Sequence, residues 1–302
     1  MSTPSLPQRY FDHLRHERRL AARTLQAYTR DVALLESLAA GRPVESLHAH
    51  DIRRFIAMLH GKGQSPRSLA RVLSSWRGLF EWLSRNALAA ANPCAGVKAP
   101  RAAKRLPEAL SPDDAVRLVC ADTGDERDGV RDRALFELAY SSGLRVSELT
   151  GLDTDAIDLA TGEARVTGKG SKTRIVPVGA PALAALRAWL RERPARARPK
   201  EAALFVGRGG GRLSPREVQR RIKRWAAAAG LAMDVHPHML RHSFASHVLQ
   251  SSGDLRAVQE MLGHASIAST QVYTHLDFQH LAKVYDAAHP RAKRAARSRN
   301  KA

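Results

Sequence analysis

Two side chains in the segment HMLRH, residues 238–242, could bind an anion together. His238 and Arg241 are three residues apart, and residues at this spacing are neighbours on the surface of an α-helix. An imidazole and a guanidinium placed in this way could hold one phosphate group. The pair alone is weak evidence, because His and Arg on a helix of a basic protein more often form a solvated surface.

A metal site is the alternative for the same helix. His238 and His242 are four residues apart, as in pairs of histidines that bind zinc from one helix. A hydrolytic zinc helix is expected to carry a glutamate beside its first histidine, and Met239 occupies that position. The sequence therefore favours an anion site, and we expect neither a metal nor a cofactor.

The charge of the whole chain also indicates an anionic partner. Of 302 residues, 49 are Lys or Arg and 29 are Asp or Glu, which gives a formal net charge of +20 and a pI near 11.0. Such a surface attracts polyanions, so nucleic acid is the leading partner. A generic basic protein, or an arginine-rich composition that reflects genomic base content, is the alternative. Hydrophobic residues make up 44% of the chain, which is enough for a packed core and excludes a largely disordered protein.

The cysteines and the apolar segments bear on the compartment. Cys94 and Cys120 are the only cysteines, and they form no CxxC pair. The sequence shows neither an apolar signal segment nor an apolar run of membrane length. We therefore expect a reducing, cytoplasmic location without a disulfide scaffold.

The N-terminal third of the sequence is predicted to be helical. Apolar residues recur at helical spacing from Thr24, a plausible N-cap, to Leu38, and again over residues 52–59 and 66–83. A less regular helix precedes them around residues 6–20. These four segments predict a small helical domain.

Further along the chain, one hairpin interrupts a second helical region. The β-rich segments 163–167 and 173–178 flank the tip GKGSK, and Pro177 is expected at a sheet edge. Helix caps and apolar periodicity predict the remaining elements. The expected helices begin at Ser111, cover 134–140 and 146–149, and then span 181–193, 214–229, 237–250 and 254–262.

These patterns predict a mainly α, multidomain protein with a small antiparallel β-sheet in its C-terminal part. Prolines, glycine and a basic cluster mark the linker, and a stretch without acids marks the tail. The expected divisions are a helical domain over 1–88, a linker over 89–108, a second domain over 109–288 and a basic tail over 289–302.

Four segments, taken together, resemble the tyrosine recombinase family. They are GLRVSEL at 143–149, the hairpin residue Lys169, HMLRH at 238–242 and LGHASIASTQVYTHL at 262–276. Each is weak alone, but their order and separation downstream of a small helical domain are highly specific. The resemblance implies the integrase fold, with an N-terminal SAM-like core-binding domain that forms half of a clamp around double-stranded DNA.

The resemblance also implies a catalytic set in which Tyr273 is the nucleophile and the other members surround a phosphate or move protons. The set is Arg145, Lys169, His238, Arg241, His264 and Tyr273.

The chemistry of a phosphodiester gives these residue types a reason. Negative charge gathers on the nonbridging oxygens under attack, and the forked guanidinium groups of Arg145 and Arg241 match that geometry. The phenol of Tyr273, with an ordinary pKa near 10, costs about 4 kcal/mol to ionise at neutral pH. Nearby cations and a base must offset that cost.

The remaining members of the set take their roles from the family. His238 would accept the Tyr273 proton, Lys169 would protonate the departing 5′ oxygen, and His264 would hydrogen-bond a phosphate oxygen. A 3′-phosphotyrosyl intermediate would keep the energy of the broken bond, so rejoining would need neither ATP nor metal.

The stretch DFQHLAKVYDAAHPRAKR, residues 277–294, resembles the C-terminal end of the family members that resolve chromosome dimers. This implies sequential strand exchange through a Holliday junction at a dif-type site, in a heterotetramer with the recombinase XerD and with FtsK as regulator at cell division. A phage or transposon integrase is the alternative within the family. A type IB topoisomerase and a non-catalytic DNA-binding regulator are the alternatives outside it.

Three apolar residues of this stretch, Leu281, Val284 and Tyr285, recur at helical spacing. By analogy with the family, we expect a terminal helix that docks on a neighbouring subunit and couples one active site to the next. Packing on the chain's own domain is the alternative.

Overall fold

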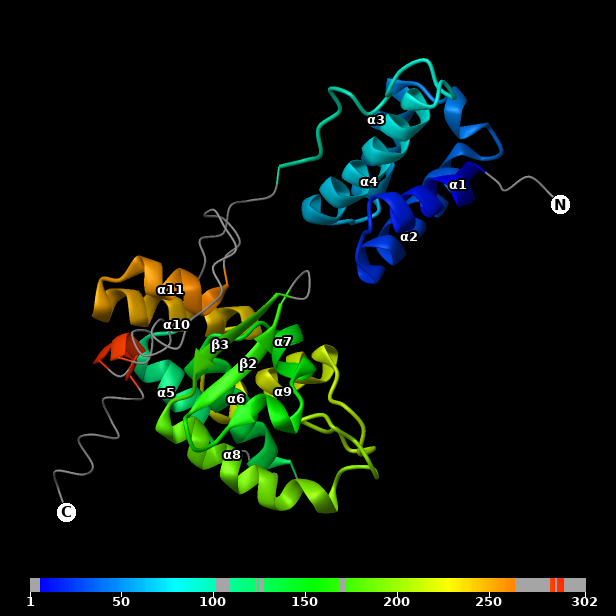
Figure 1. The fold of residues 1–302 in the computed structure, drawn as a ribbon. Helices are drawn as coiled ribbons and strands as arrows, with labels where there is room; N and C mark the ends of the chain where they lie inside the picture. Colours follow the sequence, from blue (N-terminus) through cyan, green and yellow to red (C-terminus); the bar gives the residue numbers. More distant parts are fainter. Residues whose placement is uncertain are drawn as a thin grey trace, which may run out of the picture. The chain divides into compact units, whose positions relative to one another are not determined.

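The computed structural model describes residues 6–101, 109–122, 124, 128–168, 172–263, 283–285 and 287–290. The chain divides into two compact units, Met1–Arg105 and Leu106–Ala302 (Figure 1). Each unit has its own hydrophobic core. In the described residues no helix is long and apolar enough to cross a membrane.

The first unit is a small helical bundle whose elements follow the apolar periodicity of the sequence. Its buried residues include Leu35, Phe55, Trp76 and Phe80. The indole of Trp76 donates to the Asp31 carbonyl over 2.6 Å, which fastens two of its helices together. The elements are α1 (Leu6–Asp12), a π-helical turn (His13–Glu17), α2 (Ala22–Ala39), a 3-10 turn (Val44–Ser46), α3 (Ala49–Gly61) and α4 (Pro66–Arg85).

Two helices of this unit differ in which groups accept hydrogen bonds from the first backbone amides. Ser65 caps α4, because its side chain accepts from the amide of Ser68 and Pro66 occupies the first turn. Thr24 does not cap α2 as the sequence suggested. The helix begins at Ala22 with Ala21 as N-cap and no side-chain cap, and the Thr24 amide donates to the Ala21 carbonyl.

The second unit packs helices around a three-stranded antiparallel sheet of order β1-β2-β3. Two 3-10 turns (Thr154–Ala156 and Arg193–Ala195) complete its elements. The strands are β1 (Ile157–Asp158), β2 (Glu163–Thr167) and β3 (Thr173–Pro177). The helices are α5 (Pro112–Cys120), α6 (Gly129–Ser142), α7 (Val146–Gly151), α8 (Ala180–Glu192), α9 (Pro215–Ala228), α10 (Pro237–Ser252) and α11 (Leu255–Leu262).

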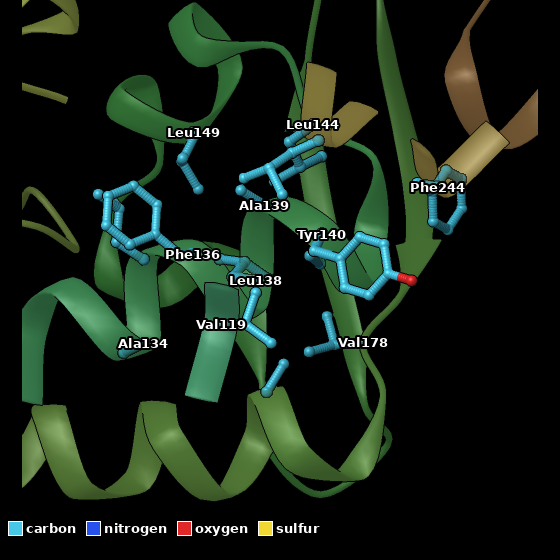
Figure 2. Packing of buried hydrophobic residues seen from close by; sticks show 14 of the residues in the cluster. Val119, Ala134, Phe136, Leu138, Ala139, Tyr140, Leu144, Leu149, Val178 and Phe244 are labelled. Carbon is cyan, nitrogen blue, oxygen red and sulfur yellow. The ribbon is translucent and has the colours of Figure 1, made fainter. Parts of the chain in front are cut away.

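Helix α6 lies at the centre of this unit, and every residue from Ala134 to Ser142 is buried. Figure 2 shows its side chains among residues of α5, α7, α10 and the end of the sheet. Helix α8 packs along α6, and strand β3 also contacts α6. The observed elements confirm the expected mainly α class with a small antiparallel sheet, although β1 was not anticipated.

The C-terminal segment contributes to the core of its own unit. Tyr285 is 1% exposed, and its hydroxyl lies 2.7 Å from Ser141 Oγ on α6. His289, expected in a basic tail, is buried and stacks on Tyr285 at 4.7 Å between ring centroids. Tyr285 therefore packs on the chain's own domain, which was the alternative reading, and docking of a terminal helix on a neighbouring subunit stays a prediction. Leu281 lies outside the described residues.

Candidate active site

The turn between α6 and α7 requires a glycine. Gly143 ends α6 with φ +57, a left-handed conformation that glycine adopts without steric cost. A Cβ at Gly143 would overlap the ring of Phe244 on α10. The glycine thus lets α10 pack directly against the turn that leads into Arg145, the N-cap residue of α7.

One buried carboxylate, that of Glu148 on α7, organises the cations around it. The backbone N–H of Arg145 donates to Glu148 Oε2 over 2.8 Å, and Arg145 Nη1 donates to Oε1 over 2.7 Å. Arg174 on β3 donates to both oxygens, over 2.9 and 3.1 Å. Arg241 on α10 lies 3.8 Å from Oε2. Three guanidinium cations against one carboxylate leave two excess positive charges.

The Glu148 carboxylate stays ionised despite its burial. Burial alone would raise the pKa, but the hydrogen bonds from Arg174 and from the Arg145 amide, together with the positive charge of Arg174, lower it to about 2. Glu148 is therefore a fixed negative charge at neutral pH, and it can orient the arginines permanently.

Arg241 is held from two sides by backbone carbonyls. Its Nη1 donates to the Gly143 carbonyl over 2.8 Å and its Nη2 to the Leu262 carbonyl over 2.6 Å. Burial, and then the positive charge of Arg145, lowers the pKa of Arg241 to about 10, so the group is still cationic at neutral pH. Each η nitrogen carries a second hydrogen, which suits contact with an oxyanion.

Arg145 is the more accessible of these two arginines. Its side chain is 36% exposed, whereas that of Arg241 is 10% exposed. In the described part of the chain its guanidinium donates to Glu148 through Nη1. The structure thus brings Arg145 and Arg241 together, as expected from the sequence.

His238 lies in the first turn of α10, three residues before Arg241, and is exposed. The preceding His236 caps the helix, because its Nδ1 accepts from the amide of Met239 over 3.2 Å. The rings of His236 and His238 are 6.4 Å apart between centroids. The expected placement of His238 and Arg241 on one helix is confirmed.

Lys169, His264 and Tyr273 lie outside the described residues. The residues that precede the first two are described. The amide of Gly168 donates to the Lys172 carbonyl over 2.8 Å, and a Cβ on Gly168 would lie 3.4 Å from Glu148 Oε1.

Gly263, which precedes His264, caps the C-terminal end of α11. A Cβ on Gly263 would lie 3.1 Å from Arg174 Nη1. The chain therefore enters the hairpin tip and the segment after α11 beside the arginine cluster.

Sequence reasoning did not single out Glu148 and Arg174. For Glu148 a signal exists, since it stands three residues after Arg145 and completes a capping box. For Arg174 the signal is misleading, because alternation in TRIVP would place the isoleucine inside. Instead Arg174 is 6% exposed and Ile175 36%.

Among the described residues, no group of three or more His, Cys, Asp or Glu side chains could hold a metal ion.

Comparison with known proteins places the chain in a family. Residues 108–280 match the model of the phage integrase family, and residues 8–87 match its N-terminal SAM-like domain. The chain belongs to the phage integrase family. The resemblance to tyrosine recombinases drawn from the sequence is thereby confirmed.

Relatives of this phage integrase family member carry a more specific name. "Tyrosine recombinase XerC 1" of Ralstonia nicotianae is 55% identical over 94% of this chain and 93% of the relative. "Tyrosine recombinase XerC" of Pseudomonas aeruginosa is 53% identical over 94% of each chain. These relatives show that the chain is a site-specific tyrosine recombinase of the XerC type. Such an enzyme binds DNA and exchanges its strands.

A solved structure of the family supports the fold. XerH site-specific recombinase, in a post-cleavage complex with a palindromic difH substrate, matches with a TM-score of 0.69 and 22% identity. The match covers 94% of this chain and 85% of that one. This confirms the integrase fold, with a SAM-like domain followed by a catalytic domain.

Proposed function

We propose that Tyr273 attacks a DNA phosphate held by Arg145 and Arg241 and forms a 3′-phosphotyrosyl intermediate. The observation that carries the proposal is the cluster in which one carboxylate, Glu148, meets three arginines. Two excess positive charges at a partly desolvated site favour the charge that develops on a phosphate under attack. His238 would accept the phenol proton.

Lys169 and His264 complete the proposed set. Lys169 would protonate the departing 5′ oxygen, and His264 would hydrogen-bond a phosphate oxygen. The positions of Gly168 and Gly263 beside the cluster support this, because each glycine directly precedes one of the two residues. The intermediate would keep the bond energy, so rejoining would need no ATP.

The surroundings of the other tyrosines support Tyr273 as the nucleophile. The sequence has five tyrosines, and three of them are at most 1% exposed. Burial raises the pKa of Tyr10, which disfavours its phenolate. The hydroxyls of Tyr140 and Tyr285 hydrogen-bond His247 and Ser141 inside the core. Tyr28 packs on the core of the first unit.

The experiment that tests this chemistry uses a nicked suicide duplex with a dif-type site in EDTA. We expect wild-type protein and the matched control Tyr28→Phe to form a covalent adduct on denaturing gels, and Tyr273→Phe to form none. An adduct with Tyr273→Phe, or one that requires a divalent metal, would contradict the proposal.

We assign DNA clamping to residues 1–88 and catalysis to residues 109–288, joined by the linker 89–108. The two matched family domains and the solved recombinase complex with difH support this assignment. The basic tail, residues 289–302, would add to the attraction for DNA.

We further propose that the enzyme acts in the cytoplasm with XerD in a heterotetramer at a dif-type site. It would resolve chromosome dimers through a Holliday junction at cell division, with FtsK as regulator. The XerC names of its relatives support this. Mixing the chain with XerD on two dif-type duplexes should give strand exchange that neither protein completes alone. Exchange without XerD would favour an independent integrase.

A further inference from the structure

Arg174 occupies an unusual place for a charged residue. It lies on β3 opposite Val166 of β2, on the strand face that also carries the buried Val176. Its side chain is 6% exposed, while the neighbouring Ile175 is 36% exposed. The strand thus buries its arginine and exposes its isoleucine. A buried ion pair contributes little net stability compared with apolar packing, so the arrangement calls for another reason.

The contacts of Arg174 join three parts of the site. Both of its η nitrogens donate to the two oxygens of Glu148 on α7. Its Nε donates to the Met261 carbonyl in the last turn of α11 over 3.0 Å. Its guanidinium also lies against Gly263, with 3.1 Å to a Cβ built there. Arg174 itself belongs to the hairpin whose tip carries Lys169.

The paired hydrogen bonds from the forked guanidinium of Arg174 fix the orientation of the Glu148 carboxylate. A carboxylate held through both oxygens by one planar guanidinium cannot rotate freely. The remaining lone pairs of the same oxygens accept from the amide and the Nη1 of Arg145. Without Arg174 only the bonds from Arg145 would restrain the carboxylate, and it could move into a closer pair with Arg241, whose Nη1 lies 3.8 Å from Oε2. Such a pair would neutralise a cation that the phosphate requires.

We propose that Arg174 is a positioning residue for strand cleavage. It holds Glu148 away from Arg241, so that Arg145 and Arg241 keep their excess charge for the scissile phosphate. It also ties that arrangement to the hairpin and to the end of α11. The inference rests on the proposed function, because it assumes that the two arginines stabilise charge on that phosphate.

The test compares Arg174→Gln and Arg174→Lys with a matched control, Arg131→Gln. Arg131 is also a buried arginine of the second unit, 1% exposed. It donates to Asp132 through two nitrogens and to the Val206 carbonyl, rather than to Glu148. The Arg131 variant therefore reports the loss of a buried ion pair away from the cluster. Arg174→Lys keeps the charge and removes the fork, and it serves if Arg174→Gln does not fold.

The readouts are the DNA dissociation constant and the single-turnover rate of adduct formation on the suicide duplex. Once wild-type cleavage has located the scissile phosphate, a second duplex carries a neutral methylphosphonate there. We expect both Arg174 variants to cleave the phosphate about 100-fold more slowly, as when a transition-state donor is lost, with binding within about threefold. On the methylphosphonate the deficit should shrink to below about tenfold, because less charge develops. Arg131→Gln should cleave at nearly the wild-type rate.

Two results would overturn the inference. One is cleavage of the phosphate by the Arg174 variants within about threefold of the wild-type rate. The other is an equal deficit on both duplexes, or an equal deficit in Arg131→Gln, since either would indicate a general structural effect. Failure of the proposed function is distinguishable, because then wild-type protein would form no metal-free adduct or Tyr273→Phe would still form one.

Discussion

At the residue scale, the Glu148 carboxylate is stabilised as an anion by the arginines around it. Removal of one partner from a buried ion pair is costly, because the other charge stays buried without compensation. For Glu148, loss of the carboxylate would leave Arg174, 6% exposed, and Arg241, 8% exposed, with too little negative charge nearby. Glu148 thus organises the arginine cluster without being a member of the proposed catalytic set.

The Glu148 pKa predicts how stability depends on pH. The pKa falls from an ordinary 4.5 to about 2 on folding, so the ionised carboxylate stabilises the folded state at pH above 4.5. That contribution, about 3 kcal/mol, is lost as the pH falls from 4.5 towards 2. Urea unfolding across this pH range should show that the unfolding free energy decreases less on acidification in Glu148→Gln than in the wild type.

The control for this measurement is Glu217→Gln. Glu217 completes the capping box of α9 with Ser214 and makes no contact with the arginine cluster in the described residues. Hydrogen bonds from the amide and hydroxyl of Ser214 lower the pKa of Glu217 against the effect of its burial. Because these bonds involve no residue of the arginine cluster, Glu217→Gln reports the loss of a capping-box carboxylate alone. An equal decrease of the unfolding free energy on acidification in the wild type and in Glu148→Gln would contradict the role of the Glu148 carboxylate in this pH dependence.

At the element scale, the close approach of α10 to the turn after α6 brings Arg241 to the Gly143 carbonyl. Gly143→Ala would place a methyl group in the Phe244 ring and strain a positive φ of +57. We expect an unfolding free energy lower by about 3 kcal/mol or more, from overpacking and left-handed backbone together. Gly253→Ala has a φ of +68 but nothing within 4 Å, and should cost about 1 kcal/mol. Equal costs in urea unfolding would contradict the packing argument.

The C-terminal segment gives a second prediction at this scale. Because Tyr285 is in the core of its own unit, Tyr285→Ala should lower the unfolding free energy by about 3 to 5 kcal/mol. The loss should be the same at low and high protein concentration. A loss that appears only at high concentration would instead support docking on a neighbouring subunit.

Many of the elements could be predicted because their signals are local. The α4 helix has its serine cap, its proline and an apolar stripe in one stretch, and strands β2 and β3 lie where the β-rich segments flank a basic tip. The two-residue β1 has no such signal. It forms through the antiparallel pairing of Ile157 and Asp158 with Ala164 and Glu163 of β2.

The arginine cluster could be predicted only in part. Arg145 and Arg241 stand in motifs that resemble the family, whereas the inward position of Arg174 depends on what lies on each face of the sheet. The alternation of polar and apolar residues predicts an inward isoleucine at 175. The ion pair with Glu148, 26 residues earlier in the chain, places Arg174 inside instead. The same holds for Tyr285, whose partner Ser141 is 144 residues away.

At the scale of the whole molecule, charge dominates the interaction with DNA. The net charge of +20 predicts that counterion release drives a large part of binding. For contact with six to ten phosphates, affinity for a random duplex should fall by about 10³ to 10⁵ between 50 and 200 mM salt. Fluorescence anisotropy measures this directly. Tyr273→Phe should show the same slope, because it removes no charge, and an affinity independent of salt would contradict the account.

The central claim is that Tyr273 becomes covalently joined to DNA. Its most direct test is peptide mapping of the metal-free adduct by mass spectrometry, with analysis of the released DNA end. We predict a phosphotyrosine at Tyr273 linked to a 3′ phosphate, and a free 5′ hydroxyl on the other strand end. A linkage at any other residue, or a 5′ phosphate end, would contradict the account.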